Sequence, residues 1–132
     1  NLKYAKLNPA NSDPWFPHNA LGWNYYNLQM YFDAMEEFQK AIAVHPAANS
    51  YLGLCDVYLD IGKYEKARDI LLKLLERPKE QINEEQLRMM LGYCNVSQGR
   101  LDEAYKVFGN RSTLGLVIKK VQNGIKIMAW RN

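Results

Sequence analysis

Along most of the chain, a set of four positions, most of them apolar or small, recurs at the spacing i, i+3, i+4 and i+7, which marks one face of an α-helix. The pattern occurs three times: at His18, Leu21, Gly22 and Tyr25; at Tyr51, Leu54, Cys55 and Tyr58; and at Arg88, Leu91, Gly92 and Asn95. Each set precedes a second apolar stripe, at Ala34, Phe38 and Ala41; at Ala67, Leu71 and Leu74; and at Ala104 and Phe108. The sequence therefore predicts three pairs of helices.

Turn residues separate the two helices of each pair. Gln29, Gly62 and Gly99 stand between the stripes, and glycine suits the left-handed residue that ends many helices. Pro46 and Pro78 are expected to end the first two second helices, because proline cannot continue the hydrogen-bond ladder. The alanines that open the second stripes are 33 and then 37 residues apart. A period of roughly 34 residues predicts helix-turn-helix units that stack on one another.

This combination of a small residue, aromatic residues, an alanine and a proline resembles the tetratricopeptide repeat family. The resemblance covers about residues 15–111 and is strongest from Leu21 through Pro46. In the third copy, Asn95 and Leu101 replace the expected tyrosines, and Gly109-Asn110 shortens the second helix. The resemblance implies an all-α fold, an α-solenoid that forms a right-handed superhelix of about three repeats.

The stripes divide the chain into five parts. Residues 1–14 are read as the end of a preceding repeat or a linker, because Tyr4 to Pro9 resembles the last turn of a second helix. We expect the chain to be a piece of a longer protein. The repeats are expected at 15–47, at 48–84 with a loop, and at 85–111 in degenerate form. Residues 112–132 are expected to form a capping helix, with a β-hairpin at Asn123-Gly124 as the alternative.

The capping helix is expected because apolar residues of the tail also keep helical spacing. They are Leu114, Val117, Ile118, Val121, Ile125 and Met128, while most of the lysines lie off this stripe.

A second strip of residues lies about a third of a turn from the packing stripe of each first helix. Its members are Asn19, Trp23, Tyr26, Asn27, Leu52, Asp56, Leu59, Asp60, Met89, Tyr93 and Ser97. In tetratricopeptide proteins the corresponding strip lines a concave groove that holds an extended peptide or a partner helix. The resemblance implies that these residues contact a partner here.

The residue types in this strip are suited to binding a polypeptide. Trp and Tyr dominate interface hot spots, and Trp23 and Tyr93 lie in the strip. Asn19 and Asn27 can pair with a peptide backbone through their amide groups. Asp56 and Asp60, one turn apart, favour a basic residue on the partner. The competing interpretation is that the aromatic side chains pack against neighbouring helices.

Charge and composition exclude several other roles. The net charge is +3, but residues 111–132 carry +5 and no acid, which leaves −2 for the rest. A nucleic-acid partner is not expected, because the basic residues do not cluster on the repeats. No apolar run approaches the roughly 20 residues of a membrane span, so a membrane role is not expected, and we expect a cytoplasmic protein. Cys55 and Cys94 lack metal or redox spacing, and Cys55 occupies a packing position, so a buried reduced thiol is predicted at Cys55.

Catalytic constellations are also missing from the sequence. His18 and His45 have no nucleophile or carboxylate beside them, and adjacent acids such as Glu36-Glu37 point to different sides of a helix and are read as solvated. We therefore expect a protein-interaction module that is not an enzyme and needs no cofactor or metal. The alternatives are a non-catalytic accessory or docking domain of a larger enzyme, such as a glycosyltransferase, and a domain that forms a homo-oligomer.

Overall fold

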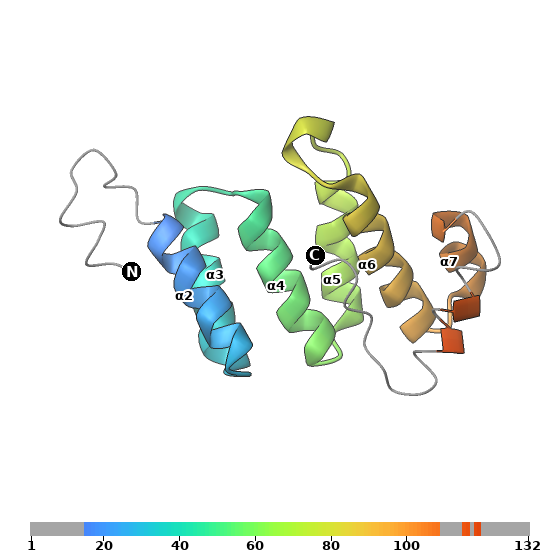
Figure 1. The fold of residues 1–132 in the computed structure, drawn as a ribbon, viewed down its shortest axis with the longest axis horizontal. Helices are drawn as coiled ribbons and strands as arrows, with labels where there is room; N and C mark the ends of the chain where they lie inside the picture. The colour runs from blue at the N-terminus through green and yellow to red at the C-terminus, as the bar shows by residue number, and fades with distance from the viewer. Residues whose placement is uncertain (1–14, 109–114, 117, 120–132) are drawn as a thin grey trace. The chain divides into compact units, whose positions relative to one another are not determined.

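The computed structural model describes residues 15–108, 115–116 and 118–119, and all the regular structure within them is helical (Figure 1). The helices are α2 (Trp15–Asn27), α3 (Tyr31–Val44), α4 (Ala48–Asp60), α5 (Tyr64–Leu74), the short 3-10 helix η2 (Lys79–Gln81), α6 (Glu84–Ser97) and α7 (Leu101–Phe108). They fall into two compact units, one ending at Gly62 and the other beginning at Lys63.

The first unit is organised around the ring of Phe38. In this unit α2 packs on α3, α3 packs on α4, and α2 also touches α4. Phe38 is fully buried on α3, with Gly22 of α2 and Gly53 of α4 both against its ring. A Cβ atom at Gly22 would lie 2.6 Å from the ring, and one at Gly53 would lie closer still. Both glycines are therefore required for the ring to fit.

The second unit packs α5 on α6 and α6 on α7. The predicted stripe on α5 is buried, as Ala67, Leu71 and Leu74 show. On α6 the buried face is broad and extends from Leu87 to Val96. The helix begins at an asparagine cap, where the Asn83 side chain accepts a hydrogen bond from the backbone N–H of Gln86 at 3.2 Å.

The three predicted turns are confirmed in their backbone geometry. Gln29, Gly62 and Gly99 have positive φ angles of 59°, 80° and 76°. At the first turn, the N–H of Met30 donates to the carbonyl of Tyr25 at 2.9 Å, and at the third turn the N–H of Arg100 donates to that of Asn95 at 2.7 Å. This six-residue closure satisfies carbonyls that the end of a helix leaves open.

The two prolines follow helix ends, as expected. α3 ends at Val44, just before Pro46, and α5 ends at Leu74, before Pro78. The interpretation of residues 1–14 lies outside the described residues, as does most of the predicted cap. Of the tail, Gly115, Leu116, Ile118 and Lys119 are helical, whereas the alternative hairpin at Asn123-Gly124 lies outside the described part. The exact repeat boundaries stay a prediction.

Candidate partner-binding face

A small cluster of amide and hydroxyl groups joins α2 to the start of α4. Its members are Asn19, Trp23, Asn49 and Ser50, which we call the amide cluster. The Oδ1 atom of Asn49 accepts two hydrogen bonds, from Nδ2 of Asn19 at 2.9 Å and from Nε1 of Trp23 at 2.8 Å. The hydroxyl of Ser50 donates to Oδ1 of Asn19 at 2.9 Å. The cluster fixes the side chains that α2 and α4 present to each other.

Burial divides the amide cluster into an inner and an outer part. Ser50 is fully buried and Asn19 is nearly so, whereas Trp23 is partly exposed and Asn49 is exposed. The inner pair is satisfied within the protein, as buried polar groups must be. Only Trp23 and Asn49 can therefore reach a partner.

Two buried aromatic rings pack against the inner side of Trp23. The Trp23 ring makes edge-to-face contacts with Phe38 at 5.2 Å and Tyr26 at 5.9 Å between centroids. Such pairs contribute about 0.5–1.5 kcal/mol beyond the area they bury. The predicted alternative, that these rings pack, therefore holds for Tyr26, which is buried, and for one side of Trp23.

A stripe of exposed groups continues along α2 from this cluster. Phe16 is 57% exposed, and it precedes Trp23 by seven residues, which places both on one side of the helix. Ala20 and Asn27 lie on the same side, partly exposed and exposed. This stripe and the outer part of the amide cluster form the candidate face, defined by Phe16, Ala20, Trp23, Asn27 and Asn49.

The predicted partner-binding residues separate into two groups by burial. Those with exposed surface are Trp23, Asn27, Leu52, Asp60, Met89 and Ser97. Those that are buried are Asn19, Tyr26, Asp56, Leu59 and Tyr93. Asn49 and Phe16 were not predicted. Asn49 lies two residues before Tyr51, the first member of the second stripe. Extending the predicted strip toward the start of the helix would therefore have included it.

The acidic pair that was expected to attract a basic partner residue is largely engaged within the protein. Asp60 accepts a hydrogen bond from the hydroxyl of Tyr31 at 2.9 Å. The Asp56 side chain is only 2% exposed. The other oxygen of Asp60 is itself buried, so a cation on a partner has little access to either carboxylate.

His18 and Glu37 form a hydrogen-bonded pair between α2 and α3. Nδ1 of His18 lies 3.1 Å from Oε2 of Glu37, and both side chains are about nine-tenths buried. The interpretation of Glu37 as a solvated acid was wrong. Glu37 also meets Lys40, three residues on, but the His18 ring that covers it lies 19 residues away on another helix, beyond any local pattern. This pair is a packing element of the first unit.

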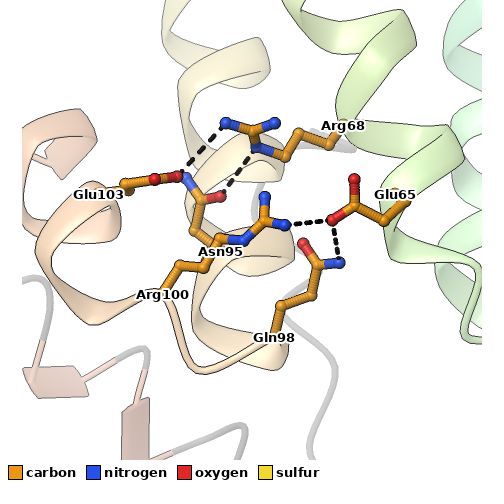
Figure 2. Close-up of polar contacts among 6 residues, drawn as sticks. All are labelled: Glu65, Arg68, Asn95, Gln98, Arg100 and Glu103. Carbon is orange, nitrogen blue, oxygen red and sulfur yellow. Dashed lines mark hydrogen bonds and ion pairs between the residues drawn. The ribbon is translucent and has the colours of Figure 1, made fainter.

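A second polar cluster joins α5 to the α6–α7 turn in the second unit (Figure 2). Nε of Arg68 donates to Oδ1 of the buried Asn95 at 3.3 Å, and its Nη2 donates to Oε2 of Glu103 at 3.3 Å. Arg68 thus bridges two partners on α6 and α7. Asn95 occupies a position where the family pattern has a tyrosine, and the amide is the acceptor that Arg68 requires.

Glu65 completes this second cluster. Its Oε1 accepts a hydrogen bond from Nε2 of Gln98 at 2.7 Å and another from Nη2 of Arg100 (Figure 2). These partners, the Gln98 amide first, lower the pKa of Glu65 below its ordinary value of 4.5. The charges of the two arginines and two glutamates cancel, so the cluster is a connection between helices rather than a site for a charged ligand.

The cysteines are inert in this structure. Cys55 and Cys94 are both buried and form no disulfide, which confirms the prediction of a buried thiol at Cys55. Burial raises the pKa of the Cys94 thiol to about 12, so it is not a ready nucleophile. Within the described ranges, no group of three His, Cys, Asp or Glu side chains could hold a metal ion, and no helix there has the length and apolar character of a membrane span.

Two models of the tetratricopeptide repeat match the chain, one over residues 20–48 and one over residues 48–81. The chain belongs to the tetratricopeptide repeat family. Its helix-turn-helix repeats place it in the α-solenoid class, as predicted.

Two curated relatives extend the comparison. The chain is 32% identical over 109 residues, 81% of its length, to the TPR repeat-containing protein MJ1428 of Methanocaldococcus jannaschii. It is 38% identical over 53 residues, 40% of its length, to Protein SULFUR DEFICIENCY-INDUCED 2 of Arabidopsis thaliana. In each case it spans only 18% of the relative's length. No solved structure matches the chain.

Proposed function

We propose that this chain is a protein-interaction module whose candidate face binds an extended segment of a partner protein. Tetratricopeptide repeats generally mediate protein–protein interaction. The observation that carries the proposal is Phe16, an exposed aromatic residue on the same side of α2 as Trp23. Aromatic side chains are enriched among the residues that carry binding energy.

The face combines an apolar surface with hydrogen-bonding groups. Phe16 and the open edge of Trp23 suit an apolar side chain, and the amides of Asn27 and Asn49 suit a peptide backbone. Leu52, on α4, adds partly exposed apolar surface. Met89, Tyr93 and Ser97 on α6 stay predicted contacts of the second unit.

The test uses a random peptide library displayed on phage. We expect the wild-type protein to enrich peptides with apolar residues, and the Phe16→Ser change to weaken binding of the best one about tenfold, because it removes an exposed aromatic contact. Val44→Ser is the matched control, since Val44 is an exposed apolar residue on α3 outside the face. Equal binding by both variants would show that the face is not the site.

Self-association is a second candidate, and a specific surface favours it. Leu28, Met30 and Phe32 surround the α2–α3 turn and are all exposed, Phe32 by 79%. Neighbouring exposed apolar residues often mark a protein interface. Sedimentation velocity over about a hundredfold range of concentration would detect a dimer, and Phe32→Glu should abolish it. A wild-type protein that stays monomeric throughout this range would refute this candidate.

The accessory-domain alternative concerns the protein as a whole. Because the chain spans only 18% of the length of each of these relatives, the activity of a longer parent protein is a separate proposal. The sequence that flanks residue 1 would decide it. A neighbouring cofactor-binding or nucleotide-sugar-binding fold would support it, and further repeats alone would count against it.

A further inference from the structure

Asn49 has an orientation that the surrounding hydrogen bonds fix. An asparagine amide can be turned by 180°, which exchanges its donor and acceptor ends. The indole N–H of Trp23 is a donor only, so the atom of Asn49 that lies 2.8 Å away must be the oxygen. The Trp23 ring thus decides which way the Asn49 amide faces.

The second hydrogen bond on Asn49 agrees with this assignment. Ser50 donates to Oδ1 of Asn19, so Nδ2 of Asn19 faces Asn49 and donates to the same Oδ1 atom. Two donors occupy the two lone pairs of the Asn49 oxygen. Its remaining capacity lies at Nδ2, which has two N–H donors and faces away from both partners.

The Asn49 amide nitrogen belongs to an exposed side chain. Within the described part of the chain, no residue accepts a hydrogen bond from it. A donor that is held in one orientation before binding loses little conformational freedom when it meets an acceptor. The same geometry makes Asn49 unsuited to accept a hydrogen bond from a partner.

The geometry points to Asn49 as the specificity-determining residue of the face: its amide nitrogen donates to a carbonyl or carboxylate oxygen of the bound segment. This inference rests on the proposed function and deepens it. It assigns the partner an acceptor oxygen next to the apolar residue that contacts Phe16 and Trp23. A partner that offers only a donor at this point, such as a lysine ammonium group, is rejected.

The Asn49→Asp variant isolates this role. An aspartate has the same shape, and one carboxylate oxygen still accepts from Trp23 and Asn19, so the amide cluster stays intact. The second oxygen replaces the donor with a negatively charged acceptor. Because Asn49 lies in the first turn of α4, a negative charge there also suits the helix dipole, and the melting temperature should not fall.

The probe is the best 12-residue peptide enriched on the wild-type protein, synthesised with a free or an amidated carboxyl terminus. We expect Asn49→Asp to weaken its binding about tenfold or more, measured by fluorescence polarisation. Asn24→Asp is the matched control, because Asn24 is an exposed asparagine of α2 outside the face. It adds the same charge nearby and should change the affinity less than about twofold.

Each result has one meaning. A tenfold loss in Asn49→Asp with little change in Asn24→Asp supports the inference, and amidation of the peptide tells whether the acceptor is a terminal carboxylate or a main-chain carbonyl. Equal affinities in the two variants overturn the inference. If Phe16→Ser still weakens binding in that case, the proposed function stands. Failure to enrich any peptide on the wild type overturns both.

Discussion

The two units join equivalent helices in different ways. In the first unit, the Phe38 ring fills the space between Gly22 of α2 and Gly53 of α4. In the second unit, Arg68 of α5 bonds to Asn95 on α6 and to Glu103 on α7. The helices share one period, yet an aromatic ring between two glycines joins three helices of the first unit, beside its amide cluster, whereas an arginine joins three helices of the second.

The turns of the two units also differ in what their side chains contact. The α2–α3 and α6–α7 turns share the left-handed residue and the six-residue hydrogen bond. Gln98 and Arg100 of the α6–α7 turn hydrogen-bond to Glu65 of α5. Leu28 and Met30, at the equivalent positions of the α2–α3 turn, are exposed instead. A repeated backbone therefore leaves the side chains of each turn free to specify what it contacts.

The largest expected effect is on the ring contact of the first unit. Gly53→Val would place a branched side chain against the buried Phe38 ring, which has little room to move because Gly22 also lies against it. We expect the free energy of unfolding in urea to fall by about 3 kcal/mol. Ala43→Val on the exposed side of α3 is the control and should cost about 0.5 kcal/mol. A Gly53→Val protein as stable as this control would disprove the close contact.

Removing the Arg68 contacts of the second unit should cost less stability than Gly53→Val does. Arg68→Met keeps the length of the side chain but removes the donor to the buried Oδ1 atom of Asn95. Leaving that acceptor unsatisfied should lower the free energy of unfolding by about 1–2 kcal/mol. The double variant Arg68→Met with Asn95→Leu should recover most of the loss, because both polar partners are then absent. Without such recovery, Arg68 would act through packing alone.

These two contacts show how far the sequence alone could lead. The helical stripes predicted the helix pairs, and the position of Gln29, Gly62 and Gly99 predicted the turns, because both signals are local. Gly22 was a member of the first predicted stripe. Gly53 was missed because its reason, the Phe38 ring, lies on another helix.

The candidate site was predictable only to the same extent. The angle around α2 predicted Trp23 as a member of the strip, but no local pattern indicates that its indole bonds to a residue 26 positions away. Asn49 and the pairing of His18 with Glu37 were therefore missed. The angle also could not tell that Asn19 and Asp56 are buried, since their burial depends on packing between helices.

The next smaller effect concerns the turns themselves. Gln29 adopts a φ of 59°, where Gly62 and Gly99 stand in the other two turns. A side chain in this region costs roughly 1–2 kcal/mol, and glycine loses part of that gain through the entropy of the unfolded chain. Gln29→Gly should thus raise the free energy of unfolding by about 0.5 kcal/mol, and Gly62→Ala should lower it by about 1 kcal/mol. A Gln29→Gly protein less stable than the wild type would mean that the Gln29 side chain makes a compensating contact.

The smallest expected effect is the pH dependence of the Glu65 contact. The pKa of Glu65 is lowered in the folded protein by Gln98 and Arg100, so the folded state binds this proton more weakly than the unfolded state does. The stabilisation is therefore fully present above the ordinary value of 4.5 and is lost as the pH falls below it through the lower folded pKa. The melting temperature of the wild type should exceed that of Glu65→Gln near neutral pH, and the difference should shrink at about pH 3. It should also shrink in about 1 M salt, because Glu65 is exposed and the screening length there is about 3 Å. A difference that grows on acidification would mean that the Gln98 and Arg100 contacts do not favour the charged form of Glu65.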